Sequence, residues 1–184
     1  EAALGADIVA IEETKELVER SKLTSSCCPA FKEYIKKFFP QLTQYISSSP
    51  SPMTAISRVI KEKFPGSKVV FIGPCTAKKA EIKDPFVAQY VDNVMTFEEL
   101  QALIDAREIS VSERSEDTYG DFGGSSFGRG FAKCGGLSSA VEEVLIETES
   151  DFVVKGVAVD GMDNVKKALI SFKNPKSEIN FVEG

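Results

Sequence analysis

The sequence of 184 residues contains no histidine. Histidine is the side chain that most often serves as a general base near neutral pH, and it is the commonest nitrogen ligand of protein-bound metals. A metal bound by this chain must therefore be held by sulfur or by carboxylate oxygen. The absence also argues against a cysteine-dependent hydrolase or transferase, because a nucleophilic thiol would lack its usual basic partner.

Positive charge is also scarce. The 22 Lys and Arg residues face 28 Asp and Glu residues, which gives a formal net charge of -6. Nucleic-acid binding depends on clustered Lys and Arg, so we expect no nucleic-acid partner. The sequence has no run of about 18 apolar residues, and its first residues, Glu1 to Asp7, do not resemble a secretory signal. We therefore expect no membrane association and a cytoplasmic location.

Cysteine is sparse as well, with four residues in the whole chain. Disulfide frameworks belong to smaller secreted domains with denser cysteine, which favours reduced thiols or metal ligands here. The hydrophobic fraction of 42% is that of an ordinary globular protein. A chain of this length buries enough apolar surface to form one substantial unit, which we expect to span residues 1–184.

Short apolar runs predict five strands, at 6–11, 69–73, 91–96, 152–159 and 179–182. Helical periodicity predicts helices at 12–21, 29–39, 52–64, 96–107, 137–147 and 163–172. Thr96 and Asp163 are expected as the N-caps of two of them. The alternation predicts an α/β fold with a mostly parallel sheet flanked by helices, and such sheets carry function in the loops beyond the carboxyl ends of their strands.

Two cysteine motifs occupy such loops. In the first, TSSCCPAF at 24–31, Pro29 can begin a helix and leave Cys27 and Cys28 in the turn before it. Neighbouring side chains diverge there, which suits one metal ligand and one free thiol. Two small buried side chains or a vicinal disulfide remain alternatives.

The second motif, FIGPCTAKKAE at 71–81, places Cys75 after a predicted strand and close to Lys78 and Lys79. Nearby positive charge favours the thiolate, which would serve as an iron–sulfur ligand or as a nucleophile. A structural cysteine beside solvated lysines remains the alternative.

Together these motifs resemble the first two signature motifs of iron-only hydrogenases. The resemblance extends through IEETKELVER, FFPQL, SPM and AKCGGLSSAV, and so covers most of the chain. It implies the two-lobed catalytic domain of that family. The cofactor implied, the H-cluster, is a 4Fe-4S cubane joined through a cysteine sulfur to a di-iron unit with carbonyl, cyanide and bridging dithiolate ligands.

The resemblance also implies roles for individual residues. Cys28 and Cys75 would ligate the cubane, Cys27 would be the thiol that exchanges protons with the di-iron unit, and Lys78 would hold a cyanide. The implied cofactor-contacting positions are Ser51, Pro52, Met53, Pro74 and Lys78. The family's third motif supplies two further cysteines. Because the chain ends at 181–184, where that motif would open, we expect this piece alone to hold no cofactor and to be inactive.

Three positions depart from the family's usual residues: Phe31 replaces a Trp, Met53 a Gln, and Gly73 a Met. Residues around a metal cluster tune its potential and reactivity, so these departures allow a slower, sensory type of hydrogenase. The implied partners are ferredoxin or another iron–sulfur electron carrier, and hydrogenase maturation proteins. The alternative is a non-catalytic hydrogenase-like protein of the cluster-assembly type.

The predicted first helix places Glu13, Glu16 and Arg20 on one face. By themselves these residues would be a solvated, salt-bridged stripe. The resemblance instead implies a proton path through Glu16, Ser47, Glu13 and Arg20 to Cys27.

The glycine-rich stretch from 120 to 136 lacks the Gly-Lys-Ser/Thr of a phosphate loop, which favours close helix packing. Cys134 lies in this stretch, outside the family's ligand motifs. We interpret it as structural, with a substitute metal ligand as the alternative.

Overall fold

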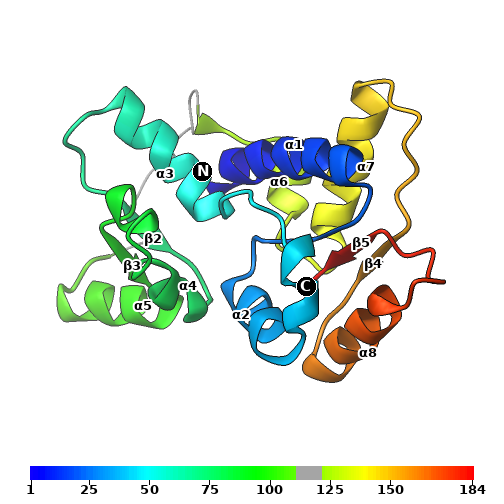
Figure 1. The fold of residues 1–184 in the computed structure, drawn as a ribbon. Helices are drawn as coiled ribbons and strands as arrows, with labels where there is room; N and C mark the ends of the chain where they lie inside the picture. The colour runs from blue at the N-terminus through cyan, green and yellow to red at the C-terminus, as the bar shows by residue number, and fades with distance from the viewer. Residues whose placement is uncertain (111–121) are drawn as a thin grey trace.

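The computed structural model describes residues 1–110 and 122–184. Its strands form two sheets, and every strand pair is parallel. The first sheet has the order β1 (Leu23–Thr24), β5 (Phe181–Glu183), β4 (Gly156–Ala158), and the second pairs β2 (Val70–Ile72) with β3 (Asn93–Met95). The α/β class with parallel pairing is confirmed, although the strands are divided between two sheets (Figure 1).

The first helix, α1 (Ala2–Arg20), corrects one expectation. The strand predicted at 6–11 is wrong, because these residues lie inside this helix. The error has a physical cause: α1 contacts α3 (Pro52–Lys63), α6 (Ser126–Gly130) and α7 (Gly136–Glu147), and a helix covered on several sides is apolar on several sides. The apolar run from Ile8 to Ile11 then looks like a buried strand.

The remaining helices are α2 (Pro29–Phe38), α4 (Ala77–Glu81), α5 (Phe97–Ala106), α8 (Met162–Lys173) and the short 3₁₀ helices η1 (Pro40–Tyr45) and η2 (Val87–Gln89). Thr96 is confirmed as a cap, since its side chain accepts from Glu99 N while the Glu99 side chain accepts from Thr96 N. Asp163 is not a cap. Gly161 precedes α8, and Asp163 lies in its first turn. The glycine-rich stretch falls partly outside the described residues, and α6 and the start of α7 account for much of the rest.

The central strand β5 separates two hydrophobic clusters because neighbouring side chains point to opposite faces. Phe181 packs with Leu17 of α1 and Val141 of α7, whereas Val182 packs with residues of α2 and α8. Figure 1 shows these helix pairs on opposite sides of the first sheet. A third cluster joins Met53 of α3 to the second sheet. Within the described ranges, no helix combines the length and apolar character needed to cross a membrane.

Candidate functional site

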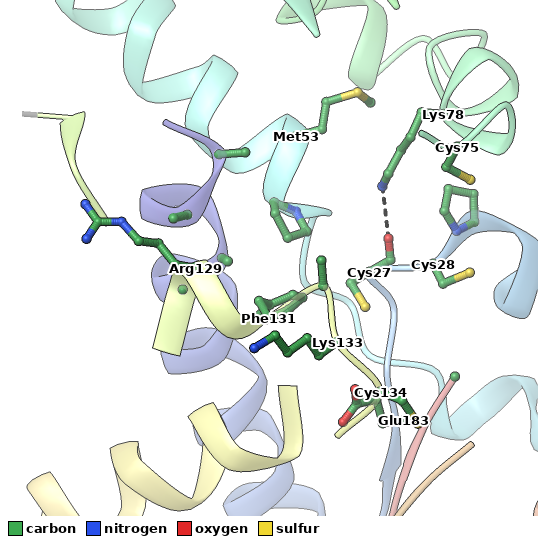
Figure 2. A pocket seen from close by; sticks show the side chains of 18 of the residues that line it. Cys27, Cys28, Met53, Cys75, Lys78, Arg129, Phe131, Lys133, Cys134 and Glu183 are labelled. Carbon is green, nitrogen blue, oxygen red and sulfur yellow. Dashed lines mark hydrogen bonds between the residues drawn. The ribbon is translucent and has the colours of Figure 1, made fainter. Parts of the chain in front are cut away.

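A cavity of about 760 Å³ opens at the carboxyl ends of the parallel strands. Cys27 follows β1, Cys75 follows β2, and Glu183 ends β5, and all three line it. This agrees with the expectation that the chemistry-bearing loops gather at this edge. Figure 2 shows the thiols of Cys27, Cys28 and Cys75 around one space, with Lys78 above them. Apolar atoms from Pro29, Pro52, Met53, Phe71 and Phe131 form much of its wall.

The two neighbouring cysteines diverge as the sequence predicted. Pro29 is the first residue of α2 and Cys28 is its N-cap. Cys28 packs against the cluster of α2 and α8, whereas Cys27 packs against the cluster of α1 and α7. Both thiols are free, so there is no vicinal disulfide. Burial raises the pKa of the Cys27 thiol, the nearby Glu13 carboxylate raises it further, and Lys78 opposes both effects.

Cys75 and Lys78 lie on the loop and short helix that follow β2. Cys75 is exposed, and Lys78 Nζ donates to Cys27 O at 2.9 Å and to Glu81 Oε2 at 2.7 Å. An ammonium group has three N–H donors, and these contacts use two of them. Lys78 therefore ties the two cysteine loops together and keeps a donor for a further acceptor.

The expected cofactor-contacting positions divide into two groups. Pro52, Met53 and Lys78 line the cavity, and Met53 is fully buried. Ser51 and Pro74 are not among its lining residues. Ser51 caps α3, where its hydroxyl lies 3.4 Å from Thr54 N and 3.3 Å from Thr54 Oγ1. The structure thus gives the Ser51 hydroxyl a capping role.

The charged residues of α1 form contacts with a loop that is distant in sequence. Arg20 donates to Glu16 and to the Gln44 and Ile46 carbonyls, and Ser47 Oγ donates to Glu16 Oε2 at 2.7 Å. Only 14% of the Glu16 side chain is exposed. These residues therefore differ from a solvated stripe. Burial alone would raise the pKa of Glu16, but hydrogen bonds from Ser47, Ser48 N and Arg20 hold it below its usual value.

Glu13 lies one turn earlier on α1 and is fully buried. Its Oε1 accepts from Ser26 N and from Ser26 Oγ, both at 2.9 Å, while Oε2 has no hydrogen-bond partner among the described residues. Burial raises the pKa of Glu13 from its usual 4.5 to about 7, and the charge of Glu16 adds to this effect. The hydrogen bonds from Ser26 and the nearby Ser47 hydroxyl act in the opposite direction. A carboxyl group with a pKa near neutrality can both accept and release a proton.

Two residues at the site were given no structural role by the sequence analysis. Ser26 contacts Glu13, and no spacing in the sequence links them, since they belong to a loop and a helix. Glu183 accepts from Gly135 N, Ser138 N and Ser138 Oγ at 3.0, 2.8 and 2.7 Å, and its carboxylate therefore covers the start of α7. Contacts between residues 45 or more positions apart give no local signal.

Cys134 lies in the loop that Glu183 holds. Cys134 is exposed and lines the cavity, and Figure 2 shows it beside Glu183. A structural cysteine is normally buried among apolar groups. The exposure of Cys134 therefore does not support the structural interpretation.

The donor set suits part of an iron–sulfur site. Soft thiolates prefer such clusters, and apolar walls suit them. Within the part of the chain that the structure describes, no three Cys, Asp or Glu side chains are grouped closely enough to hold a metal ion. Cys28 and Cys75 can therefore supply a share of a thiolate set, and the remaining ligands must come from elsewhere.

Comparisons with known proteins agree with this chemistry. The family model described as "Iron only hydrogenase large subunit, C-terminal domain" matches residues 1–184. Iron hydrogenase 1 of Clostridium pasteurianum is 26% identical over 98% of this chain and 35% of its own length. The cytosolic Fe-S cluster assembly factor NAR1 of Eremothecium gossypii is 29% identical over 59% of this chain and 25% of its own.

Among solved structures, the FeFe-hydrogenase HydA(deltaEFG), from work on stepwise H-cluster assembly, matches with a TM-score of 0.70. It is 24% identical, and the match covers 97% of this chain and 64% of that one. This likeness shows the shared fold. The chain spans about a third of the Clostridium relative's length.

Proposed function

The chain belongs to the family of iron-only hydrogenase large subunits, and from that membership we propose that it forms part of a catalytic domain that interconverts protons and molecular hydrogen. The family's cofactor is the H-cluster, which when bound would relay electrons from the donor and supply the iron site for this reaction. Cys28 and Cys75 would hold its cubane, and the apolar wall that includes Met53 and Phe71 would exclude water. Because the chain covers a minor share of its relative, the whole protein's activity is part of the proposal.

The observation that carries this proposal is the buried, titratable Glu13. Burying a carboxyl group is costly when one of its oxygens has no hydrogen-bond partner, as for Glu13 Oε2 among the described residues, and groups of this kind cluster at functional sites. Glu13 lies between the Arg20, Glu16 and Ser47 contacts on one side and the loop of Cys27 on the other. We assign these residues to a proton path that ends at the Cys27 thiol. Because Arg20 contacts Glu16 and the Gln44 and Ile46 carbonyls, it stands at the surface end and not next to the thiol as the resemblance implied, and Glu16, Ser47 and Glu13 follow it.

Each station of this path has a group suited to it. Glu16 is the partly exposed carboxylate at the surface end, with Arg20 beside it. The Ser47 hydroxyl donates to Glu16 and lies near enough to Glu13 to influence its pKa. Burial keeps Cys27 in its protonated form, so it can hold a proton at the cavity wall.

A non-catalytic protein of the cluster-assembly type is the second candidate, and the match to NAR1 favours it. Such a protein has no need for a buried carboxyl relay beside Cys27, nor for the Lys78 ammonium at the cavity. These two features support the enzyme. An iron–sulfur protein such as ferredoxin is the proposed electron donor, with maturation proteins as further partners. The cytoplasmic location stays a prediction.

The substitution at Gly73 supports a slow or sensory enzyme. A Cβ at Gly73 would lie 2.7 Å from Phe71 Cε1, so the Phe71 ring occupies the space beside this residue. Phe71 also lines the cavity. The family's flexible methionine is thus replaced by a glycine with the Phe71 ring beside it, which would alter the surroundings that tune the cofactor.

The proton path can be tested in the complete hydrogenase that contains this chain. We expect Glu13→Gln and Glu16→Gln each to lower hydrogen turnover by about 100-fold or more, the usual effect of losing an acid–base group. Cluster spectra should stay unchanged, because neither residue is a ligand. Hydrogen evolution with a reduced dye and infrared spectra of the cofactor measure the two effects.

Glu19→Gln is the matched control for these substitutions. Glu19 lies on the same helix but is exposed, so its loss should leave turnover unchanged. A Glu13→Gln, Glu16→Gln double variant that keeps the wild-type rate would contradict the proton path. Absence of any hydrogen turnover in the wild-type protein with intact cofactor would contradict the enzyme itself.

A further inference from the structure

The Ser26 hydroxyl lies between two acceptors. Its Oγ is 2.9 Å from Glu13 Oε1 and 2.7 Å from the carbonyl oxygen of Ser49. Both distances are those of good hydrogen bonds, yet a serine hydroxyl has a single proton to donate. At any moment, therefore, Ser26 donates to Glu13 or to Ser49.

The protonation state of Glu13 decides between these arrangements. When Glu13 is ionised, its Oε1 is the stronger acceptor, and both the N–H and the O–H of Ser26 donate to it. When Oε1 carries a proton, its O–H can donate to Ser26 Oγ, and the Ser26 proton then turns to Ser49 O. Each arrangement keeps the Ser26 hydroxyl hydrogen-bonded, and no bond within Ser26 breaks.

We propose that Ser26 is a positioning residue whose hydroxyl turns between Glu13 and the Ser49 carbonyl as Glu13 releases and takes up its proton. The functional role of this hydroxyl rotation rests on the proposed proton path. Ser26 is 2% exposed, so water does not compete for these contacts. Because Oε2 of Glu13 has no partner among the described residues, Ser26 provides the hydrogen bonds that respond to the charge of Glu13.

This arrangement suits a relay because both protonation states of Glu13 are hydrogen-bonded without any movement of the backbone. Ser26 directly precedes Cys27, so the same contact fixes the carboxyl group beside the loop that carries the thiol. A rotating hydroxyl responds within nanoseconds or less. The proton exchange of Glu13 then needs no rearrangement of the fold.

The titration of Glu13 must be distinguished from that of the charged groups around it. Among the described groups, Glu16 on α1 and the Cys27 thiol on the loop interact with its charge, and Lys78 reaches the same loop at Cys27 O. The pKa of Glu16 is held below its usual value and that of Cys27 is raised. Neither group therefore titrates with Glu13, and a residue-specific measurement can follow Glu13 alone.

Carbon-13 NMR of the 184-residue chain tests the motion directly. The Glu13 Cδ signal reports its ionisation, and the Ser49 carbonyl carbon reports the hydrogen bond that it accepts. We expect the Ser49 carbonyl signal to move downfield as the pH falls, with the same midpoint as Glu13. A Ser49 signal that stays constant while Glu13 titrates would overturn the proposal.

Ser26→Ala provides the second arm. It removes the hydroxyl and keeps the backbone N–H. Because hydrogen bonds to a charged group are about twice as strong as those to a neutral one, we expect the Glu13 midpoint to rise by about one pH unit. The Ser49 response should vanish. An unchanged midpoint would contradict the proposal, and if the variant does not fold, the wild-type Ser49 signal decides.

Ser25→Ala is the matched control. Ser25 is fully buried on the same loop, but its Oγ accepts from Gly184 N at 3.3 Å and does not contact Glu13. It should leave both signals unchanged, and an equal shift in both variants would count against Ser26. These titrations measure no hydrogen turnover. A negative result would remove the Ser26 motion and leave the proposed enzyme standing. A Glu13→Gln variant that keeps the wild-type rate would remove the proton path, and only the absence of hydrogen turnover in the wild-type protein would remove the enzyme.

Discussion

Glu13 and Glu16 show how far two identical side chains can differ on one helix. They are three residues apart on α1, yet Glu13 is fully buried and Glu16 is partly exposed. Burial raises the pKa of Glu13, while donors from Ser47, Ser48 and Arg20 lower that of Glu16. The pair therefore offers one carboxylate that stays ionised at neutral pH and one that titrates there, as acid–base stations require.

The raised pKa of Glu13 predicts a pH dependence of folding stability. The folded state holds its proton up to about pH 7, whereas the unfolded chain releases it near 4.5. Protonated Glu13 therefore stabilises the fold below pH 4.5, and this stabilisation is lost as the pH rises to 7. We expect a loss of up to about 3 kcal/mol in the free energy of unfolding across this window.

Urea unfolding of the wild-type chain and of Glu13→Gln at several pH values measures this. The variant should show a much flatter profile between pH 5 and 7, whatever its absolute stability. Groups whose pKa is lowered in the folded state, such as Glu16, change the stability at more acidic pH and do not contribute between pH 5 and 7. Identical slopes for the two proteins would show that Glu13 is not the group responsible.

At the scale of the elements, α1 owes its place to glycine. A Cβ at Gly5 would lie 2.1 Å from Pro52 O and 3.0 Å from Ile56 Cβ, so only glycine lets α1 approach α3 this closely. This contact places α1, which carries Glu13, against α3, whose Met53 lines the cavity. At this position a residue with higher helix propensity would destabilise the protein, because its Cβ would clash with α3.

Gly5→Ala should therefore destabilise the protein, although alanine is the better helix former by about 1 kcal/mol. Overpacking a core contact costs about 1 to 3 kcal/mol, so after the gain in helix propensity we expect a net loss of about 1 kcal/mol in the free energy of unfolding. Gly130→Ala is the control, because nothing lies within 4 Å of its added Cβ. Chemical denaturation of both variants decides, and equal stabilities would refute the close-packing argument.

At the scale of the whole molecule, strands β1 and β2 direct two cysteine-bearing loops to one cavity, and under the proposed function their thiols would form a partial ligand set. Cys28 and Cys75 come from loops after β1 and β2, and Lys78 joins these loops through Cys27 O. No third metal ligand accompanies the two thiols within the described residues. Under the proposed function, the fold therefore organises the residues of the proton path more completely than the metal ligands.

The 184-residue chain should consequently bind iron poorly. After anaerobic reconstitution with iron and sulfide, we expect well below four iron atoms per chain, because two thiolates hold a cubane weakly. Cys28→Ala should lower the iron content further, whereas Cys27→Ala should leave it unchanged. Iron and acid-labile sulfide analysis measures this, and a stable stoichiometric four-iron cluster on the isolated chain would contradict it.

Local chemistry explains what could be predicted from the sequence. Pro29 has no N–H to lose at a helix start, so α2 and the turn holding Cys27 and Cys28 followed from that residue. Thr96 with Glu99 is a complete capping signal within four residues. The resemblance of the cysteine motifs to iron-only hydrogenases, confirmed by the family match, also needs only neighbouring residues.

Tertiary contacts determined the rest. The burial that made α1 look like a strand, and that separates Glu13 from Glu16, comes from α3, α6 and α7, and no local pattern records it. Ser26 meets Glu13 across a loop. The sequence alone therefore determined which reactive groups are present, because reactivity depends on residue type. Only the fold determined their charge states and partners, because desolvation and hydrogen bonding depend on what surrounds each group in space.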